Sequence, residues 1–247
     1  WRDVARRIAH EIKNPLTPIQ LSAERLRRKY RARIADDVDT FDRCTETIIR
    51  QVGDIGRMVD EFSAFARMPA PRFAPENPAE LLRQAVFAQR VAAPEILVEI
   101  AEPLPKAVLN CDGRMVGQAL TNILKNAGEA VAAQRAVKSM TFDRAHPGII
   151  ARLEVANGLA SFVIDDDGVG LPDKDRDRLT EPYVTTREKG TGLGLAIVKR
   201  ICEDHGGELR LADAASLSGA RVCLIFPLEP TVKAGREEAS RGAGAAQ

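Results

Sequence analysis

Two long runs of apolar residues at heptad spacing constrain the first seventy residues more than any other feature. The first run comprises Ile8, Ile12, Leu16, Ile19, Ala23, Leu26 and Tyr30. The second comprises Val38, Phe41, Thr45, Ile48, Val52, Ile55, Val59, Phe62 and Ala66. Steps of three and four residues are typical of packed helices. Because long helices gain most of their stability from packing, one hairpin cannot bury such a seam alone, and we expect a homodimeric four-helix bundle.

A histidine with polar neighbours lies within the first run. Residues four apart share one face of an α-helix, so Asn14 is expected directly below His10, with Glu11 beside the ring. Pro15 and Pro18 each remove a helical N–H, which we expect to loosen and bend this turn. His10 falls roughly opposite the apolar seam and should face solvent. By itself, the stretch also fits a surface histidine in a proline-kinked helix.

Composition indicates a globular chain of one or two domains. The 247 residues are 45% apolar and 29% charged, with a formal net charge of +1. This charge predicts no bulk attraction to nucleic acid or to an anionic membrane. Six of the nine residues from 25 to 33 are basic, but only one is aromatic and no recognition motif surrounds them. We interpret this run as the solvated end of the first helix and expect no nucleic-acid partner.

A proline-rich segment separates the helical region from a part of mixed composition. The expected organisation is a helical hairpin over 1–68, an extended linker over 69–76, a layered α/β domain over 77–229 and a disordered tail over 230–247. In the α/β domain, the patterns predict helices at 78–92, 114–134 and from 192 to about 205. They predict strands at 97–101, 107–111, 149–156, 161–165, 207–212 and 220–226, with a hairpin turn at Asn157-Gly158.

The first of three chemically informative motifs in this domain lies on the helix predicted over 114–134. Asn122, Asn126 and, with some drift, Glu129 share its polar face, while apolar residues pack inward. Amide oxygens suit Mg²⁺ when phosphates supply the other ligands. A solvated helix face explains these residues equally well when they are taken alone.

The second motif is Asp165-Asp166-Asp167-Gly168-Val169-Gly170, directly after an apolar strand. A carboxylate at a strand end can accept a hydrogen bond from the exocyclic amine of a base, and glycines let the backbone approach the ring. A plain turn is the simpler interpretation. A calcium-binding loop is excluded because its ligand spacing is absent.

The third motif, Gly190-Thr191-Gly192-Leu193-Gly194-Leu195, opens a helix. Glycine-rich turns at helix N-termini offer backbone N–H groups to phosphates. The motif lacks both the Rossmann spacing and the lysine of a P-loop. The three motifs are far more informative together, in this order, than any one of them alone.

Together with the histidine stretch, these motifs resemble those of sensor histidine kinases. His10–Pro15 is similar to the family's H box, and the helix around Asn126 to its N box. Asp166–Gly170 is similar to the G1 box, Glu181–Arg187 to the F box and Gly190–Gly194 to the G2 box. Tyr183 stands in the F box where phenylalanine is commoner. The resemblance covers residues 2 to about 228 and is strongest to nitrogen-regulation kinases of the NtrY type.

The resemblance implies a dimerisation and histidine-phosphotransfer hairpin, followed by an ATP-binding α/β sandwich of the Bergerat fold. It implies an ATP-dependent protein-histidine kinase in which His10 is the phospho-acceptor and Glu11 the base or orienting group at its ring. Asn14 would hold the water that dephosphorylates a partner. That partner would be a response-regulator receiver domain, which takes the phosphoryl group on an aspartate.

For the second domain, the resemblance implies ATP and Mg²⁺ as cofactors. Asn126 would bind the metal ion, Asp166 would recognise adenine, and residues 171–189 would form a lid over the nucleotide. The residues implied at the nucleotide are Asn122, Lys125, Asn126, Asp166, Gly168, Gly170, Tyr183, Thr185, Thr186, Arg187, Gly190, Thr191, Gly192, Leu193 and Gly194. Since the family's input domains and membrane spans are missing, we expect this chain to be the cytoplasmic portion of a longer inner-membrane sensor.

Two other functions stay open at this point. An ATPase of the same nucleotide fold, such as the gyrase and Hsp90 relatives, needs a carboxylate one turn before the metal-binding asparagine, and Asn122 occupies that position. A non-catalytic dimeric scaffold could keep the fold, although every motif residue is intact. An acid-labile, alkali-stable phosphoryl group on the protein after incubation with Mg-ATP distinguishes the kinase from both.

Overall fold

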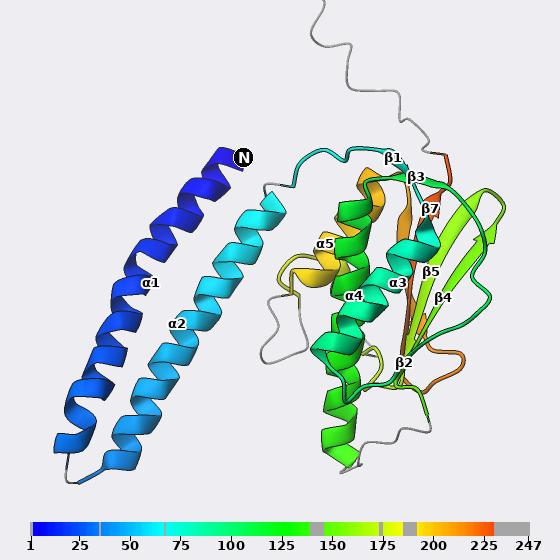
Figure 1. Cartoon of the computed structure of the whole chain (residues 1–247). Helices are drawn as coiled ribbons and strands as arrows, with labels where there is room; N and C mark the ends of the chain where they lie inside the picture. Colours follow the sequence, from blue (N-terminus) through cyan, green and yellow to red (C-terminus); the bar gives the residue numbers. More distant parts are fainter. Residues whose placement is uncertain are drawn as a thin grey trace, which may run out of the picture. The chain divides into compact units, whose positions relative to one another are not determined.

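The computed structural model of the chain describes residues 2–34, 36–66, 68–138, 146–172, 175–184 and 192–229. The chain divides into two compact units (Figure 1). The first comprises residues 1–69 and 181–193, and the second comprises 70–180 and 194–247. No helix in the described ranges combines the length and the apolar character needed to cross a bilayer.

The first unit contains the predicted helical hairpin. Helix α1 (Arg2–Tyr30) is followed by a 3₁₀ turn η1 (Arg31–Arg33) and by helix α2 (Val38–Ala66). Helix α1 runs through Pro15 and Pro18 without ending, so the prolines do not divide it. Ion pairs join the two arms of the hairpin, from Lys13 of α1 to Asp60 of α2 and from Arg31 of η1 to Asp42 of α2, the latter at 2.8 Å.

The hairpin buries one side of its apolar seam and exposes the other. The residues buried between the helices include Ala9, Ala23, Thr45, Val52 and Val59. The exposed seam residues, each 39–48% accessible, include Ile12, Ile19, Leu26, Ile48 and Ile55. Both sets repeat mainly at seven-residue intervals, as expected for two neighbouring stripes on each helix. The single hairpin therefore leaves a long apolar stripe in contact with water.

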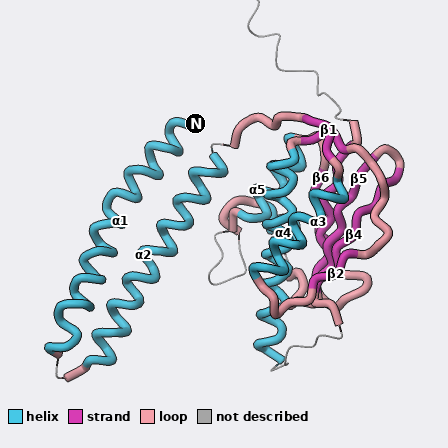
Figure 2. The backbone as a smooth tube through the Cα atoms, in the orientation of Figure 1, coloured by secondary structure: helices cyan, strands magenta, loops and turns pink. Residues whose placement is uncertain are grey.

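The second unit is a five-stranded sheet with three helices. The strand order is β2-β4-β5-β7-β6, in which β2 and β4 are parallel and the other pairs antiparallel. The strands are β2 (Val98–Ile100), β4 (Ile149–Ala156), β5 (Leu159–Asp166), β6 (Glu208–Asp213) and β7 (Ala220–Pro227). Helices α3 (Pro78–Ala92), α4 (Gly113–Lys138) and α5 (Gly194–Asp204) lie on one face of the sheet, and the short η2 (Arg176–Thr180) precedes α5 (Figures 1 and 2). This α/β unit confirms the predicted fold class.

Alternation along β5 separates its residues between the two faces of the sheet. Ala160, Phe162 and Ile164 are buried, and Asp166 continues this set at the strand end. Asp165 lies between two members of the set and belongs to the opposite face. The predicted Asn157-Gly158 turn fixes the register, because both residues adopt positive φ, at 51° and 75°.

The segment expected to be a linker makes contacts with the second unit. Residues 74–76 form strand β1 (Ala74–Glu76), which pairs antiparallel with β3 (Leu109–Cys111). The backbone N–H of Arg72 donates a hydrogen bond to Asp112 Oδ2 at 3.0 Å, and the Phe73 ring lies 5.2 Å from that of His205. Residues 72–76 are therefore anchored to the α/β unit.

His205 is the centre of this anchor. Its side chain is buried between Phe73 and Phe226. The Nε2 atom accepts the N–H of Asp112 at 3.0 Å, so the proton lies on Nδ1, which contacts the carbonyl of Ile201 at 2.8 Å. The ring thus connects the end of α5, the start of α4 and the segment before β1.

Replacing His205 should destabilise the second unit. His205→Ala removes two buried hydrogen bonds and the packing of a ring, and we expect a loss of about 2–4 kcal/mol in the free energy of unfolding. Urea denaturation of the whole chain, followed through its second-unit transition, measures this loss. The control His146→Ala alters an exposed histidine and should leave the transition unchanged. An equal effect of both variants would show that the buried ring has no special anchoring role.

Candidate nucleotide-binding site and phosphoacceptor helix

The carboxylate of Asp166 lies at the end of β5 and is held by backbone hydrogen bonds. It is 3% exposed, and its Oδ1 atom accepts the backbone N–H of Gly168 at 2.9 Å and of Ala220 at 3.1 Å. The Asp166 carbonyl accepts the N–H of Gly219 at 3.0 Å. Hydrogen bonds to a charged acceptor are the stronger kind. The protein's own backbone therefore sets the orientation of the carboxylate.

Gly168 allows helix α4 to approach this carboxylate closely. A Cβ atom at residue 168 would lie 2.6 Å from the Cβ of Ala130 and 2.8 Å from Asp166 Oδ1. Gly170 is required for a different reason, since its φ of 76° favours glycine. The structure thus favours glycine at residue 168 because α4 comes close and at residue 170 because of its backbone conformation, while the approach of this backbone to a base ring stays a prediction.

Helix α4 also brings the asparagine motif to the start of α5. Asn122 and Asn126 are half-buried on α4, while Lys125 is exposed and pairs with Glu129 at 4.0 Å. A Cβ atom at Gly194 would lie 3.7 Å from the Asn126 side-chain nitrogen. The Asn126 amide therefore lies beside the N-terminus of α5, whose backbone N–H groups favour anions.

Between the second and third motifs, Tyr183 is in close contact with Gly192. The Tyr183 N–H donates to the Gly192 carbonyl at 3.1 Å, and a Cβ at Gly192 would lie 2.6 Å from the Tyr183 carbonyl carbon. Gly192 has a φ of 70°. The Tyr183 ring is exposed and the Leu193 side chain is buried, so Leu193 packs rather than presenting its side chain to solvent. The remaining predicted residues, Thr185, Thr186, Arg187, Gly190 and Thr191, lie outside the described residues.

The predicted phosphoacceptor residues lie on the first half of α1. His10, Glu11 and Asn14 are all exposed, which confirms the expectation that His10 faces solvent. His10 and Asn14 are one turn apart on a continuous helix. Between them in sequence, Lys13 forms its ion pair with Asp60, which links this part of α1 to α2.

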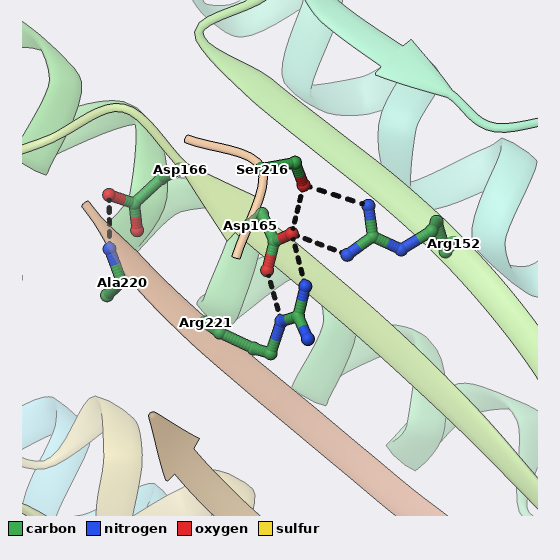
Figure 3. Close-up of polar contacts among 6 residues, drawn as sticks. All are labelled: Arg152, Asp165, Asp166, Ser216, Ala220 and Arg221. Atoms are coloured by element: carbon green, nitrogen blue, oxygen red, sulfur yellow. Dashed lines mark hydrogen bonds and ion pairs between the residues drawn. The ribbon is translucent and has the colours of Figure 1, made fainter. Parts of the chain in front are cut away.

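Sequence reasoning missed a charged cluster on the opposite face of β5 (Figure 3). Asp165 is fully buried and accepts two hydrogen bonds from Arg221, at 2.7 and 2.8 Å, and further ones from Arg152 and Ser216. Burial alone would raise the pKa of Asp165, but the hydrogen bonds from Arg221, Arg152 and Ser216 outweigh it and lower the pKa to about 2. The available signal was an acidic residue directly after the apolar run Phe162-Val163-Ile164 of the same strand.

A metal ion at this site would depend on the nucleotide for most of its ligands. In the described ranges, no three His, Cys, Asp or Glu side chains converge to form a metal-binding group. The half-buried Asn126 amide oxygen suits Mg²⁺, which prefers oxygen ligands and commonly takes several from phosphates. The donor set therefore fits a Mg²⁺ ion that arrives with a triphosphate.

Two protein-family models match this chain. The model described as "His Kinase A (phospho-acceptor) domain" matches residues 1–71, and the model described as "Histidine kinase-, DNA gyrase B-, and HSP90-like ATPase" matches residues 111–230. The chain belongs to the sensor histidine kinases. It therefore carries both the phosphoacceptor and the ATPase-like domain of an ATP-dependent protein-histidine kinase.

Individual relatives place this kinase near the nitrogen-regulation proteins. It is 54% identical to nitrogen regulation protein NtrY of Azorhizobium caulinodans over 93% of this chain and 29% of that protein. It is 30% identical to sensory histidine kinase/phosphatase NtrB of Rhodobacter capsulatus over 92% of this chain and 62% of that protein. The solved structure of the mycobacterial sensor histidine kinase MprB covers 63% of this chain with 27% identity and a TM-score of 0.52, and 97% of that structure is matched. The chain thus spans well under half the length of its NtrY relative.

A methyl group at residue 168 should damage the site. In Gly168→Ala the added Cβ meets Ala130 and Asp166 Oδ1, so α4 or the carboxylate must move. We expect the dissociation constant of Mg-ATP to rise about tenfold or more, together with about 1–3 kcal/mol of destabilisation. Calorimetric titration of nucleotide measures the first effect, and urea denaturation the second.

Gly117→Ala is the matched control, because a Cβ at this position on α4 meets nothing within 4 Å. It should leave nucleotide affinity unchanged and raise stability by about 0.5–1 kcal/mol. Unchanged affinity in Gly168→Ala would mean that the close approach of α4 does not shape the nucleotide site.

Proposed function

We propose that this chain autophosphorylates on His10 with Mg-ATP and transfers the phosphoryl group to an aspartate of a response-regulator receiver domain. The observation that carries the proposal is the convergence of Asp166, Gly168, Asn126 and Gly194 around α4, in a chain that also presents an exposed His10. The proposed domains are a phosphotransfer hairpin over 1–68 and an ATP-binding domain that begins at the anchored segment 72–76.

In the nucleotide site, Asp166 is proposed to accept a hydrogen bond from the exocyclic amine of adenine. Its orientation is set by the N–H groups of Gly168 and Ala220, so no reorganisation is needed when the base arrives. Asn126 would hold Mg²⁺ together with phosphate oxygens, and the backbone at the start of α5 would contact the phosphates. When bound, Mg²⁺ neutralises charge on the triphosphate. Lys125 and Asn122 lie one residue and one turn before Asn126 and are proposed to be near the phosphates.

The chemical step uses the imidazole of His10 as nucleophile. Glu11 accepts the N–H of one ring nitrogen, which leaves the lone pair of the other nitrogen for the γ-phosphorus. The N–P bond forms while the bond from the γ-phosphorus to the bridging oxygen breaks, and ADP leaves with that electron pair. The carboxylate of Glu11 stabilises the positive charge that develops on the ring. In the second step, a receiver-domain aspartate displaces the imidazole from phosphorus.

The proposed active form is a homodimer. The exposed apolar stripe of the hairpin, which includes Ile12, Ile19, Ile48 and Ile55, requires a partner surface of the same kind. A second hairpin supplies that surface and completes a four-helix bundle. His10, roughly opposite the seam in sequence, would stay accessible to the receiver domain.

We also propose that the whole protein is a membrane-anchored sensor with this chain on its cytoplasmic side, which fractionation of the full-length protein would test.

The decisive test of the kinase assignment is the chemistry of the phosphorylated product. After incubation with Mg-ATP, the parent chain should carry a phosphoryl group that is labile in acid and stable in alkali. His10→Gln should abolish it without changing Mg-ATP affinity, since glutamine offers no comparable nucleophile and His10 and Asp166 belong to different compact units. His146→Gln, which alters another exposed histidine, is the control and should be phosphorylated normally. Phosphorylation that persists in His10→Gln would overturn the assignment.

A further prediction concerns the reverse flow of phosphate. We propose that Asn14 holds the water that hydrolyses the regulator's aspartyl phosphate, because an amide can both donate and accept a hydrogen bond. Asn14→Ala should keep His10 phosphorylation within a few-fold of the parent but lose most phosphatase activity. The measurement is regulator dephosphorylation in the presence of ADP, beside the autophosphorylation rate.

Ser22→Ala, at an exposed position farther along α1, is the control and should retain both activities. If Asn14→Ala loses both activities equally, Asn14 shapes the helix and has no separate hydrolytic role.

A further inference from the structure

Three consecutive aspartates bind the loop between β6 and β7. Asp165 accepts a hydrogen bond from the hydroxyl of Ser216 at 2.8 Å. Asp167 accepts two hydrogen bonds from Ser218, one from its hydroxyl and one from its backbone N–H at 3.3 Å. Asp166, which lies between them in sequence, accepts two more hydrogen bonds. Its backbone carbonyl accepts one from the N–H of Gly219, and its carboxylate accepts one from the N–H of Ala220. Residues 214–219 are therefore tied to the end of β5 at three successive positions.

The first of these ties is held by a buried charge cluster. Asp165 is fully buried, and Arg221 binds both of its carboxylate oxygens from β7 while Arg152 approaches from β4 (Figure 3). Ser216 lies between Asp165 and Arg152, within 3.4 Å of the arginine. A bidentate pair between an arginine and a carboxylate adds geometric specificity to the interaction. The cluster therefore locks β4, β5, β7 and the loop in one arrangement.

Asp165 cannot itself meet a nucleotide held by Asp166. Successive side chains of a strand point to opposite faces of the sheet, and Figure 3 shows the Asp165 and Asp166 carboxylates separated in this way. Any effect of the cluster on Asp166 must pass through the loop and the backbone. The loop is well placed to transmit it, because a Cβ at Gly219 would collide with Asp166 Oδ1. A displaced loop would withdraw the Ala220 N–H from the carboxylate.

We propose that Asp165 and Asp167 are positioning residues for nucleotide selectivity. Through Ser216 and Ser218, they hold residues 214–219 against β5 and so keep the Ala220 N–H on Asp166 Oδ1. This inference rests on the proposed role of Asp166 in adenine recognition. A fixed carboxylate accepts from the amine of adenine and repels the carbonyl that guanine presents in its place. A carboxylate that can rotate discriminates less.

The test removes the two hydroxyl ties and leaves the charges in place. Calorimetry with Mg-ATP and Mg-GTP is performed on the parent chain, on Ser216→Ala/Ser218→Ala and on the reference variant Asp166→Asn. Ser161→Ala is the matched control, since Ser161 lies on the Asp165 face of β5, four residues before it. In the double serine variant, we expect the ratio of the GTP to the ATP dissociation constant to fall about fivefold, with the control unchanged.

The outcomes separate the two proposals. If Asp166→Asn keeps the parent's selectivity ratio, the adenine role of Asp166 is wrong and the positioning inference falls with it. If Asp166→Asn lowers the ratio but the double serine variant does not, the adenine role stands and the positioning inference is overturned. An equal weakening of ATP and GTP in the double serine variant also overturns it, because the loop would then support the fold without orienting the carboxylate.

Discussion

The hydrogen bonds from Gly168 and Ala220 to Asp166 Oδ1 are the contacts on which the rest of the nucleotide site depends. They connect the end of β5 to the start of β7. The same turn brings Gly168 against Ala130 of α4, the helix that carries Asn126, the residue proposed to bind Mg²⁺. Hydrogen bonds from backbone groups are fixed before a ligand binds, which is the condition for strong electrostatic recognition. The adenine contact proposed for Asp166 and the phosphate contacts proposed for the start of α5 would therefore both depend on α4, which Gly168 and Gly194 approach closely.

Local sequence patterns predicted the elements and most of the motif geometry. Heptad spacing predicted the hairpin and its incomplete burial, which the exposed Ile19 and Ile48 confirm. The Asn157-Gly158 pair predicted the β4–β5 turn because both residues tolerate positive φ. These predictions succeeded because helix periodicity and turn chemistry are encoded within a few neighbouring residues. The prediction that the aspartate motif lies at the end of an apolar strand followed from the same kind of local evidence.

Features that depend on strand pairing could not be predicted in this way. The Asp165–Arg221 pair joins residues 56 positions apart, and it exists because β5 and β7 are paired in one register. The anchoring of residues 72–76 likewise depends on β3 and on a histidine from the end of α5. In the sequence, this segment is extended and proline-rich, which is equally typical of a linker and of a short edge strand. Tertiary contacts decided between the two.

The protein's own backbone should orient the Asp166 carboxylate before nucleotide binds. Amide hydrogen exchange at Gly168 and Ala220, measured in the nucleotide-free chain and again with Mg-ATP, tests it most directly. Both amides should be protected without nucleotide, and Ala220 should be protected about as well as its neighbours on β7. Rapid exchange at both amides in the free chain, with protection appearing only when Mg-ATP is added, would contradict it.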